Sequence, residues 1–309
     1  MASPATKFVA CVLTGLLGAV FAGAACAQVN VTTYHYDNYR TGWNANETNL
    51  TQSNVNNSSF GLLATVPLDD QVDAQPLLVN GVTIGGVQHN VLYVATENNS
   101  VYAIDAQSGT VLLQTNLGTP VSWPQGCGNN GPNVGIGSTP VIDAANGILY
   151  VIAYTLQNST PTYVLHALAL GTLLDSAAPA VVGASGTLKN GRIYQFNAST
   201  QRQRAALLLA NNTVYAGFAS FCDFAANDSR GWVRGWQGGT LAPLAASKLT
   251  NVRPRSPDTF FLSSVWMSGY GLAANSAGSV YFVTGNSDYS GTTYGKTKRN
   301  GTLLDLTRI

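Results

Sequence analysis

A strand–turn–strand unit occurs four times in this 309-residue chain and constrains its fold more than any other feature. Each copy has a short apolar strand, a turn containing Gly or Asn, and a second strand that carries a tyrosine. The four aligned tyrosines are Tyr93, Tyr150, Tyr215 and Tyr281. A meander repeated in this way, with no helical period, is typical of sheets arranged radially. The repeat therefore predicts an all-β fold, a β-propeller of four-stranded blades with four recognisable copies.

The first copy shows the pattern most clearly. It predicts strands at Pro76–Val79 and Val91–Thr96, a turn at Asn80-Gly81, and a third strand at Val101–Asp105. Further third strands are expected at Tyr163–Leu170 and Gly231–Gln237, and one strand before the repeat at Phe60–Leu68. A β-sandwich and a parallel β-helix are the alternative folds, but neither accounts for this unit and its spacing. Four copies leave open whether the ring closes.

The charge content excludes some partners. Charged residues make up 9% of the chain and the formal net charge is +1, whereas roughly 25% is usual in soluble proteins. This net charge gives no reason to expect nucleic acid or an anionic membrane as a partner.

The N-terminus has the features of a targeting segment. Lys7 precedes an apolar stretch, Phe8–Ala22, that is short for a membrane span, and small residues flank Cys26. We expect residues 1–27 to be a signal peptide and the protein to be exported to the periplasm or beyond the cell. Lipidation at Cys26 is the alternative. Residues 28–70 are then an arm with a first strand, residues 71–295 the blades, and residues 296–309 a tail outside the repeat.

Two cysteines remain after export, Cys127 and Cys222. An oxidising compartment favours a disulfide between them, and two buried thiols are the alternative. Neither has a second Cys or a His at metal-ligand spacing, so no metal site is predicted.

Two places are candidates for ligand binding. The arm holds His35, Asp37 and Arg40 among aromatic residues, where they form either a structural hydrogen-bonding knot or a pocket. Trp123 lies in a long loop beside Cys127 and could stack on a ligand or pack inside the fold.

The motif after the second strand resembles the repeat of the pyrroloquinoline-quinone (PQQ) propellers. That repeat has the form aromatic–Ala-x-Asp-x-x-Ser/Thr-Gly-x-x-x-Trp. The matching residues here are Tyr102, Ala103, Asp105, Ser108 and Gly109. The resemblance implies a secreted bacterial propeller, and it implies PQQ with calcium as the family's cofactor.

The departures from that family bear on activity. Leu113 replaces the repeat Trp, and no adjacent Cys-Cys pair is present. The sequence therefore predicts a non-catalytic binding or assembly scaffold with an unidentified ligand or protein partner. A diverged quinoprotein-like oxidoreductase and a carbohydrate-binding or carbohydrate-active protein are the alternatives. An open ring would leave an unpaired edge, so self-association is expected.

Overall fold

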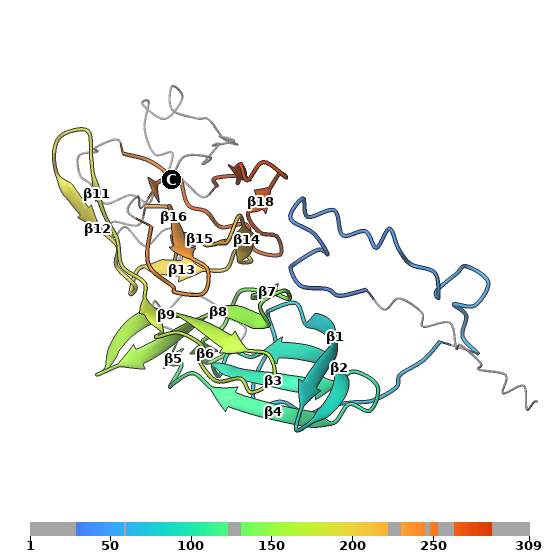
Figure 1. Ribbon diagram of the computed structural model, residues 1–309. Helices are drawn as coiled ribbons and strands as arrows, with labels where there is room; N and C mark the ends of the chain where they lie inside the picture. The colour runs from blue at the N-terminus through green and yellow to red at the C-terminus, as the bar shows by residue number, and fades with distance from the viewer. Residues whose placement is uncertain are drawn as a thin grey trace, which may run out of the picture.

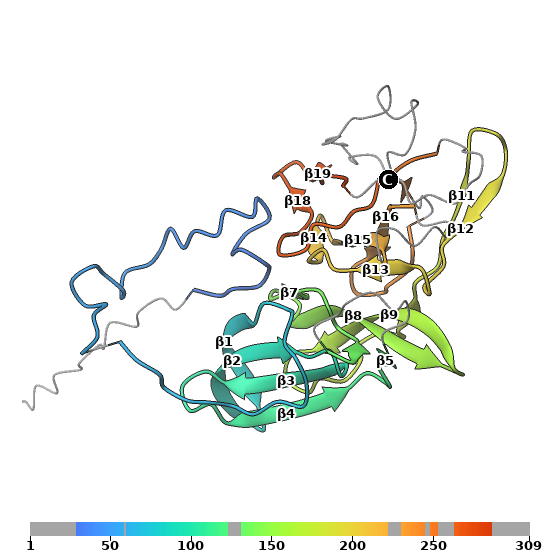
Figure 2. The same cartoon turned by 180° about the vertical axis from the view of Figure 1, so that it is seen from behind.

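The computed structural model describes residues 29–58, 60–122, 131–221, 230–244, 248–252 and 263–285. Within these ranges the chain forms strands and no helix. The strands make successive antiparallel sheets that follow one another along an arc, with the N-terminal arm between the first and last of them (Figures 1 and 2). The predicted all-β architecture of repeated blades is confirmed.

The first blade is the most regular. Its strands, in spatial order, are β1 (Leu77–Ile84), β2 (Val87–Ala95), β3 (Ser100–Asp105) and β4 (Val111–Asn116). The predicted turn at Asn80-Gly81 is wrong, because β1 continues through it with a register shift between Val79 and Val82. The chain reverses at Gly85-Gly86 instead, where both residues have positive φ. Gly81 also has a positive φ and so forms a bulge rather than a turn.

The second blade has the same order from its inner to its outer edge. Its strands are β7 (Val141–Asp143), β8 (Ile148–Gln157), β9 (Thr160–Ala169) and β10 (Ala180–Val181). A short pair, β5 (Val121–Ser122) and β6 (Asn133–Val134), precedes it. The predicted third strand at Tyr163–Leu170 corresponds to β9.

The third and fourth blades complete the arc. The third contains β13 (Gln201–Gln203), β14 (Leu208–Ala210), β15 (Thr213–Ser220), β16 (Trp232–Gln237) and β17 (Lys248–Leu249). A hairpin of β11 (Ser185–Thr187) and β12 (Ile193–Gln195) lies before it. The fourth is described as β18 (Ala273–Ala274) and β19 (Val280–Tyr281).

The repeated tyrosines pack each blade against the next. Tyr93 donates a hydrogen bond from its hydroxyl to the carbonyl of Leu170 in the second blade, at 2.8 Å. The Tyr150 hydroxyl accepts the N–H of Gly239 in the third blade. Tyr215 lies in the apolar cluster shared by the third and fourth blades. These three tyrosines are buried between sheets, and the hydroxyls of Tyr93 and Tyr150 have hydrogen-bond partners there, as a buried phenol requires.

The strand predicted at Phe60–Leu68 is wrong. The structure assigns no strand to these residues, although Val66 and Leu68 pack on a small apolar cluster of blade 1 that includes Tyr102 and Ile104. Its apolar residues suit a strand, but a strand needs a neighbour, and no described strand pairs with this segment. Leu62 and Leu63 are 85% and 88% exposed.

Candidate functional site

The first described part of the arm, Val29–Gly42, runs across the inner strands of all four blades, and we call it the axial segment. Val31 pairs with Leu78 of β1 through reciprocal backbone hydrogen bonds of 2.8 and 2.9 Å. Thr32 accepts the N–H of Ile142 in β7. Asn38 accepts the N–H of Ala274 in β18. The axial segment is therefore hydrogen-bonded to inner strands of the first, second and fourth blades.

Arg40 ties the axial segment to the third and fourth blades. Its Nε donates to the carbonyl of Leu272 at 2.8 Å, and one Nη donates to the carbonyl of Leu207 at 3.0 Å. The other Nη donates to Thr33 and to the carbonyl of Tyr34. The side chain is 2% exposed. Burial lowers the pKa of Arg40 to about 10, so the guanidinium stays charged at neutral pH.

His35 and Asp37 lie on a different side of this segment. The His35 ring stacks on Tyr34 with 4.2 Å between centroids. Asp37 is partly exposed and accepts hydrogen bonds from the hydroxyl and N–H of Thr41. Burial raises the pKa of Asp37, but the hydrogen bonds from Thr41 and from neighbouring N–H groups outweigh it and lower the pKa overall. The structure thus places Arg40 in a structural network; ligand binding by these three residues stays a prediction.

Three residues of the axial segment have strained backbone conformations. His35, Tyr36 and Arg40 all have positive φ, between 54° and 68°. Such conformations cost non-glycine residues roughly 1–3 kcal/mol each and persist only where surrounding contacts impose them. The hydrogen bonds of the axial segment supply those contacts.

A second group of charged residues gathers at the end of the blades where the inner strands begin. We call it the rim cluster, and it consists of Asp73, Glu97, Arg202 and Arg204. Arg204 donates to Asp73 and to the carbonyl of Gly137, both at 2.6 Å. Glu97 accepts the N–H of Gly135 at 2.6 Å. Asp73 and Glu97 belong to the first blade, and Arg202 and Arg204 belong to the third, so the cluster joins these two blades.

Glu97 is the residue of this cluster with the most altered acidity. It is 3% exposed. Burial is the main cause that raises the pKa of Glu97 to about 7. The charge and hydrogen bond of Asp73 act in the same direction, and the N–H of Gly135 and the charge of Arg202 act against it. A carboxyl group of this acidity exchanges a proton near neutral pH.

The two arginines were not anticipated from the sequence. Arg202 lies over the rings of Phe221 and Trp266, at 5.6 and 5.7 Å from their centroids. One sequence signal could have identified them: Gln and Arg alternate in Gln201–Arg204, directly before an apolar strand. Such a pattern is conspicuous in a chain with few charged residues.

The repeat motif has a structural geometry. Asp105 accepts the N–H groups of Gln107 and Ser108 and the hydroxyl of Ser108, and its second oxygen lies 2.8 Å from the imidazole of His89. The His89 hydrogen bond contributes most to lowering the pKa of Asp105 to about 2. Gly109 takes a φ of +73° at the end of the turn. Tyr102 and Ala103 are buried in β3.

The remaining predicted site residues, Trp123, Cys127 and Cys222, lie outside the described residues, as does the expected signal peptide. Ligand stacking, the disulfide and export stay predictions.

The rim cluster does not fit a quinone held by calcium. Calcium takes six to eight oxygen ligands. Here Asp73 already accepts from Arg204 and Gln71, and Glu97 accepts from Gly135. Among the described residues, no group of three or more His, Cys, Asp or Glu could hold a metal ion.

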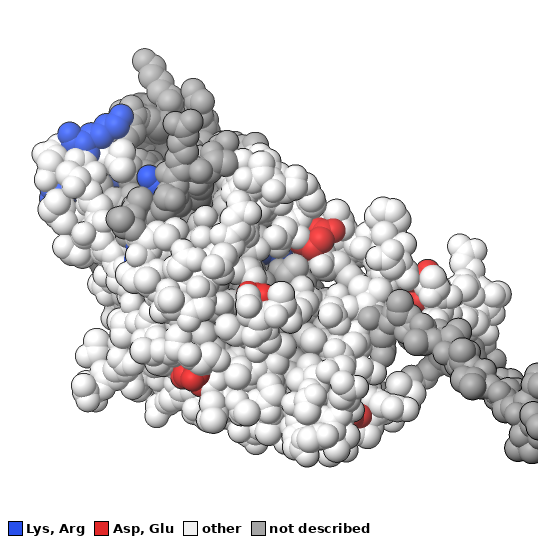
Figure 3. Space-filling view, viewed as in Figure 1, with Lys and Arg blue, Asp and Glu red and all other residues white. Residues whose placement is uncertain are grey.

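The surface agrees with the composition. The face in Figure 3 is largely uncharged, with a few separate acidic patches and basic residues gathered at one end. In the part of the chain that the structure describes, no helix is long and apolar enough to cross a membrane.

Comparisons with known proteins agree with the fold. No family model matches the sequence, and no curated protein matches it. The structure is similar to the quinohemoprotein alcohol dehydrogenase of Comamonas testosteroni, with a TM-score of 0.54 and 16% identity over 84% of this chain and 36% of that one. It is also similar to quinohemoprotein alcohol dehydrogenase ADHIIG of Pseudomonas putida HK5, with a TM-score of 0.55 and 17% identity over 84% of this chain and 35% of that one.

The chain spans about a third of the length of these two dehydrogenases. At such identity the likeness shows the fold alone. The resemblance predicted from the repeat motif is confirmed at that level: the protein has the β-propeller architecture of the PQQ-repeat proteins.

Proposed function

We propose that this protein is a non-catalytic binding or assembly scaffold. The observation that carries the proposal is the axial segment, which is hydrogen-bonded to all four blades. Propellers surround a central channel with their blades, and we propose that the axial segment takes the place of that channel here. In the rim cluster, Arg204 forms an ion pair with Asp73. We therefore propose that binding takes place on the outer surface.

The exposed leucines beside blade 1 support an assembly role. Phe60, Leu62 and Leu63 are 61–88% exposed in a segment that no described strand pairs with. A run of exposed apolar side chains next to unpaired backbone is a surface that favours association with another sheet. We propose self-association there, and we propose that it takes place outside the cytoplasm, as the expected leader implies.

Two measurements test this function on the mature protein. Thermal unfolding with PQQ and calcium should show no stabilisation, whereas a ligand at a hundred times its dissociation constant would add about 2.7 kcal/mol. Light scattering after size exclusion should show oligomers that the Leu62→Ser/Leu63→Ser variant loses. Stabilisation by PQQ with calcium, or a wild type that stays monomeric at all concentrations, would contradict the proposal.

A diverged oxidoreductase is the second candidate, and Glu97 is the observation that favours it. A buried carboxyl with a pKa of about 7 beside Arg202 and Arg204 can accept a proton at neutral pH. Dye reduction that requires PQQ and calcium and is lost in Glu97→Gln would establish this candidate instead of the scaffold.

A further inference from the structure

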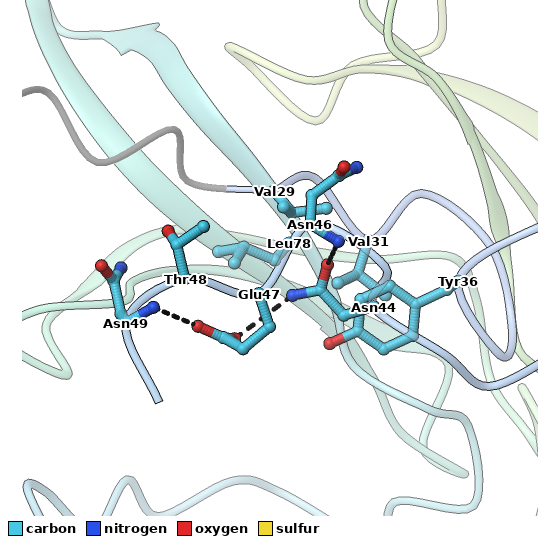
Figure 4. Close-up of a pocket in the computed structure, with 9 residues that line it drawn as sticks. All are labelled: Val29, Val31, Tyr36, Asn44, Asn46, Glu47, Thr48, Asn49 and Leu78. Atoms are coloured by element: carbon cyan, nitrogen blue, oxygen red, sulfur yellow. Dashed lines mark hydrogen bonds between the residues drawn. The ribbon is translucent and has the colours of Figure 1, made fainter. Parts of the chain in front are cut away.

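The arm and the first blade line a small, partly open pocket, to which the axial segment contributes Val29, Val31 and Tyr36. Its cavity volume is about 150 Å³ (Figure 4). Three of its lining side chains are aliphatic: Val29, Val31 and Leu78. The others come from Tyr36 and from the loop that follows it, residues 44–49. The pocket thus combines an apolar part with an aromatic ring and a polar loop.

The loop is held in shape by its own charged residue. Glu47 accepts the N–H groups of Asn49 and Leu50 at 2.7 and 2.9 Å, and its other oxygen accepts the amide of Asn44. Asn44 in turn accepts the N–H of Asn46. The backbone hydrogen bonds from Leu50 and Asn49 lower the pKa of Glu47, so it remains ionised while its oxygens are engaged inside the loop. Its charge therefore serves the loop rather than a ligand.

Four polar side chains of the pocket have no hydrogen-bond partner within the described residues. They are the hydroxyls of Tyr36 and Thr48 and the amides of Asn46 and Asn49. Hydroxyl and amide groups both donate and accept, so they can match groups that do the same. None of the four carries a charge at neutral pH, and the pocket offers no uncommitted ion to a charged ligand.

We infer that this pocket binds a ring of a neutral carbohydrate. A sugar ring has an apolar C–H face, which suits the aliphatic residues and the Tyr36 ring, and hydroxyls around its edge, which suit Asn46, Thr48 and Asn49. A cavity of about 150 Å³ is of the size that admits a single six-membered ring. Trp43, next to this loop in the sequence, is 70% exposed and offers a second flat surface to a longer chain.

This inference rests on the proposed binding function and names the chemical class of one ligand, but it uses none of the residues proposed for self-association. Leu62→Ser/Leu63→Ser should keep carbohydrate binding even where it abolishes oligomers. The two proposals can therefore fail separately.

The test is titration calorimetry of the mature protein with neutral tetrasaccharides: cellotetraose, maltotetraose, xylotetraose and chitotetraose. At least one should bind. The affinity should fall about tenfold or more in Asn46→Ala/Asn49→Ala, as expected when central polar contacts are removed. Asn57→Ala, an exposed asparagine on the same arm outside the pocket, is the matched control and should bind as the wild type does.

Salt dependence separates a neutral ligand from a charged one. Affinity should change less than about twofold between about 50 and 500 mM NaCl, because no free charge takes part. The inference is overturned if the folded wild type binds none of the four sugars, if Asn46→Ala/Asn49→Ala binds as tightly as Asn57→Ala, or if binding weakens steeply with salt.

Discussion

Replacing Arg40 tests whether the axial segment holds the blades together. In Arg40→Ala, four hydrogen bonds from a buried guanidinium are lost, two of them to carbonyls in different blades. The carbonyls of Leu207 and Leu272 would lose a charged donor in a buried setting. A buried acceptor left without its donor costs roughly 1–3 kcal/mol, so for two such carbonyls we expect a loss of roughly 3–5 kcal/mol. For a domain of this size, that corresponds to a fall in melting temperature of roughly 6–20 °C.

Urea unfolding followed by tryptophan fluorescence and circular dichroism measures this loss. Arg40→Lys keeps the charge but one ammonium cannot span both carbonyls, so its loss should be intermediate. Lys189→Ala, at an exposed position, is the control and should stay within about 0.5 kcal/mol of wild type. If Arg40→Ala unfolds within about 1 kcal/mol of wild type, the axial segment does not stabilise the blades as argued.

Two further predictions concern acidity and backbone. Because burial raises the pKa of Glu97 from 4.5 to about 7, the folded protein keeps a proton there that the unfolded chain releases. The unfolding free energy should therefore fall as pH rises from 4.5 to 7, by up to about 1.4 kcal/mol per pH unit. In Glu97→Gln this decline should be smaller. If the unfolding free energies of the two proteins change in parallel with pH, the assignment of the decline to Glu97 is refuted. A Cβ on Gly109 would lie 2.8 Å from that of Ala64, and φ is +73°. Gly109→Ala should cost roughly 2–4 kcal/mol, whereas Gly85→Ala, with positive φ but open space around it, should cost about 1–2 kcal/mol. Equal melting temperatures for the two variants would show that the contact with Ala64 is unimportant.

The blades could be predicted because their information is local. Tyr93, Tyr150 and Tyr215 each follow a turn signal and lie in a strand whose apolar run is short, so neighbouring residues alone specify the meander. The Asn80-Gly81 error shows the limit of such signals. A glycine with positive φ serves a bulge as well as a turn, and only the pairing of β1 with β2 decides between them.

The sites could not be predicted in the same way, because they depend on contacts between distant residues. Glu97 and Arg204 lie in different blades, and the paired state of their cluster follows from how the sheets pack. The partners of Arg40 are 167 and 232 residues away. The sequence identified Arg40 as a candidate but could not decide between a structural hydrogen-bonding knot and a ligand pocket. The contacts that distinguish these two alternatives are made between residues far apart in the chain.

Hydrogen exchange followed by mass spectrometry tests the central claim most directly, namely that the axial segment is bound into all four blades. The amides of Val31, Leu78, Ile142 and Ala274 each donate across this junction. Peptides that contain them should exchange only when the whole protein unfolds, in step with the strands of the blades. Exchange of residues 29–42 at the rate of an unstructured chain, while β8 and β9 stay protected, would contradict the account.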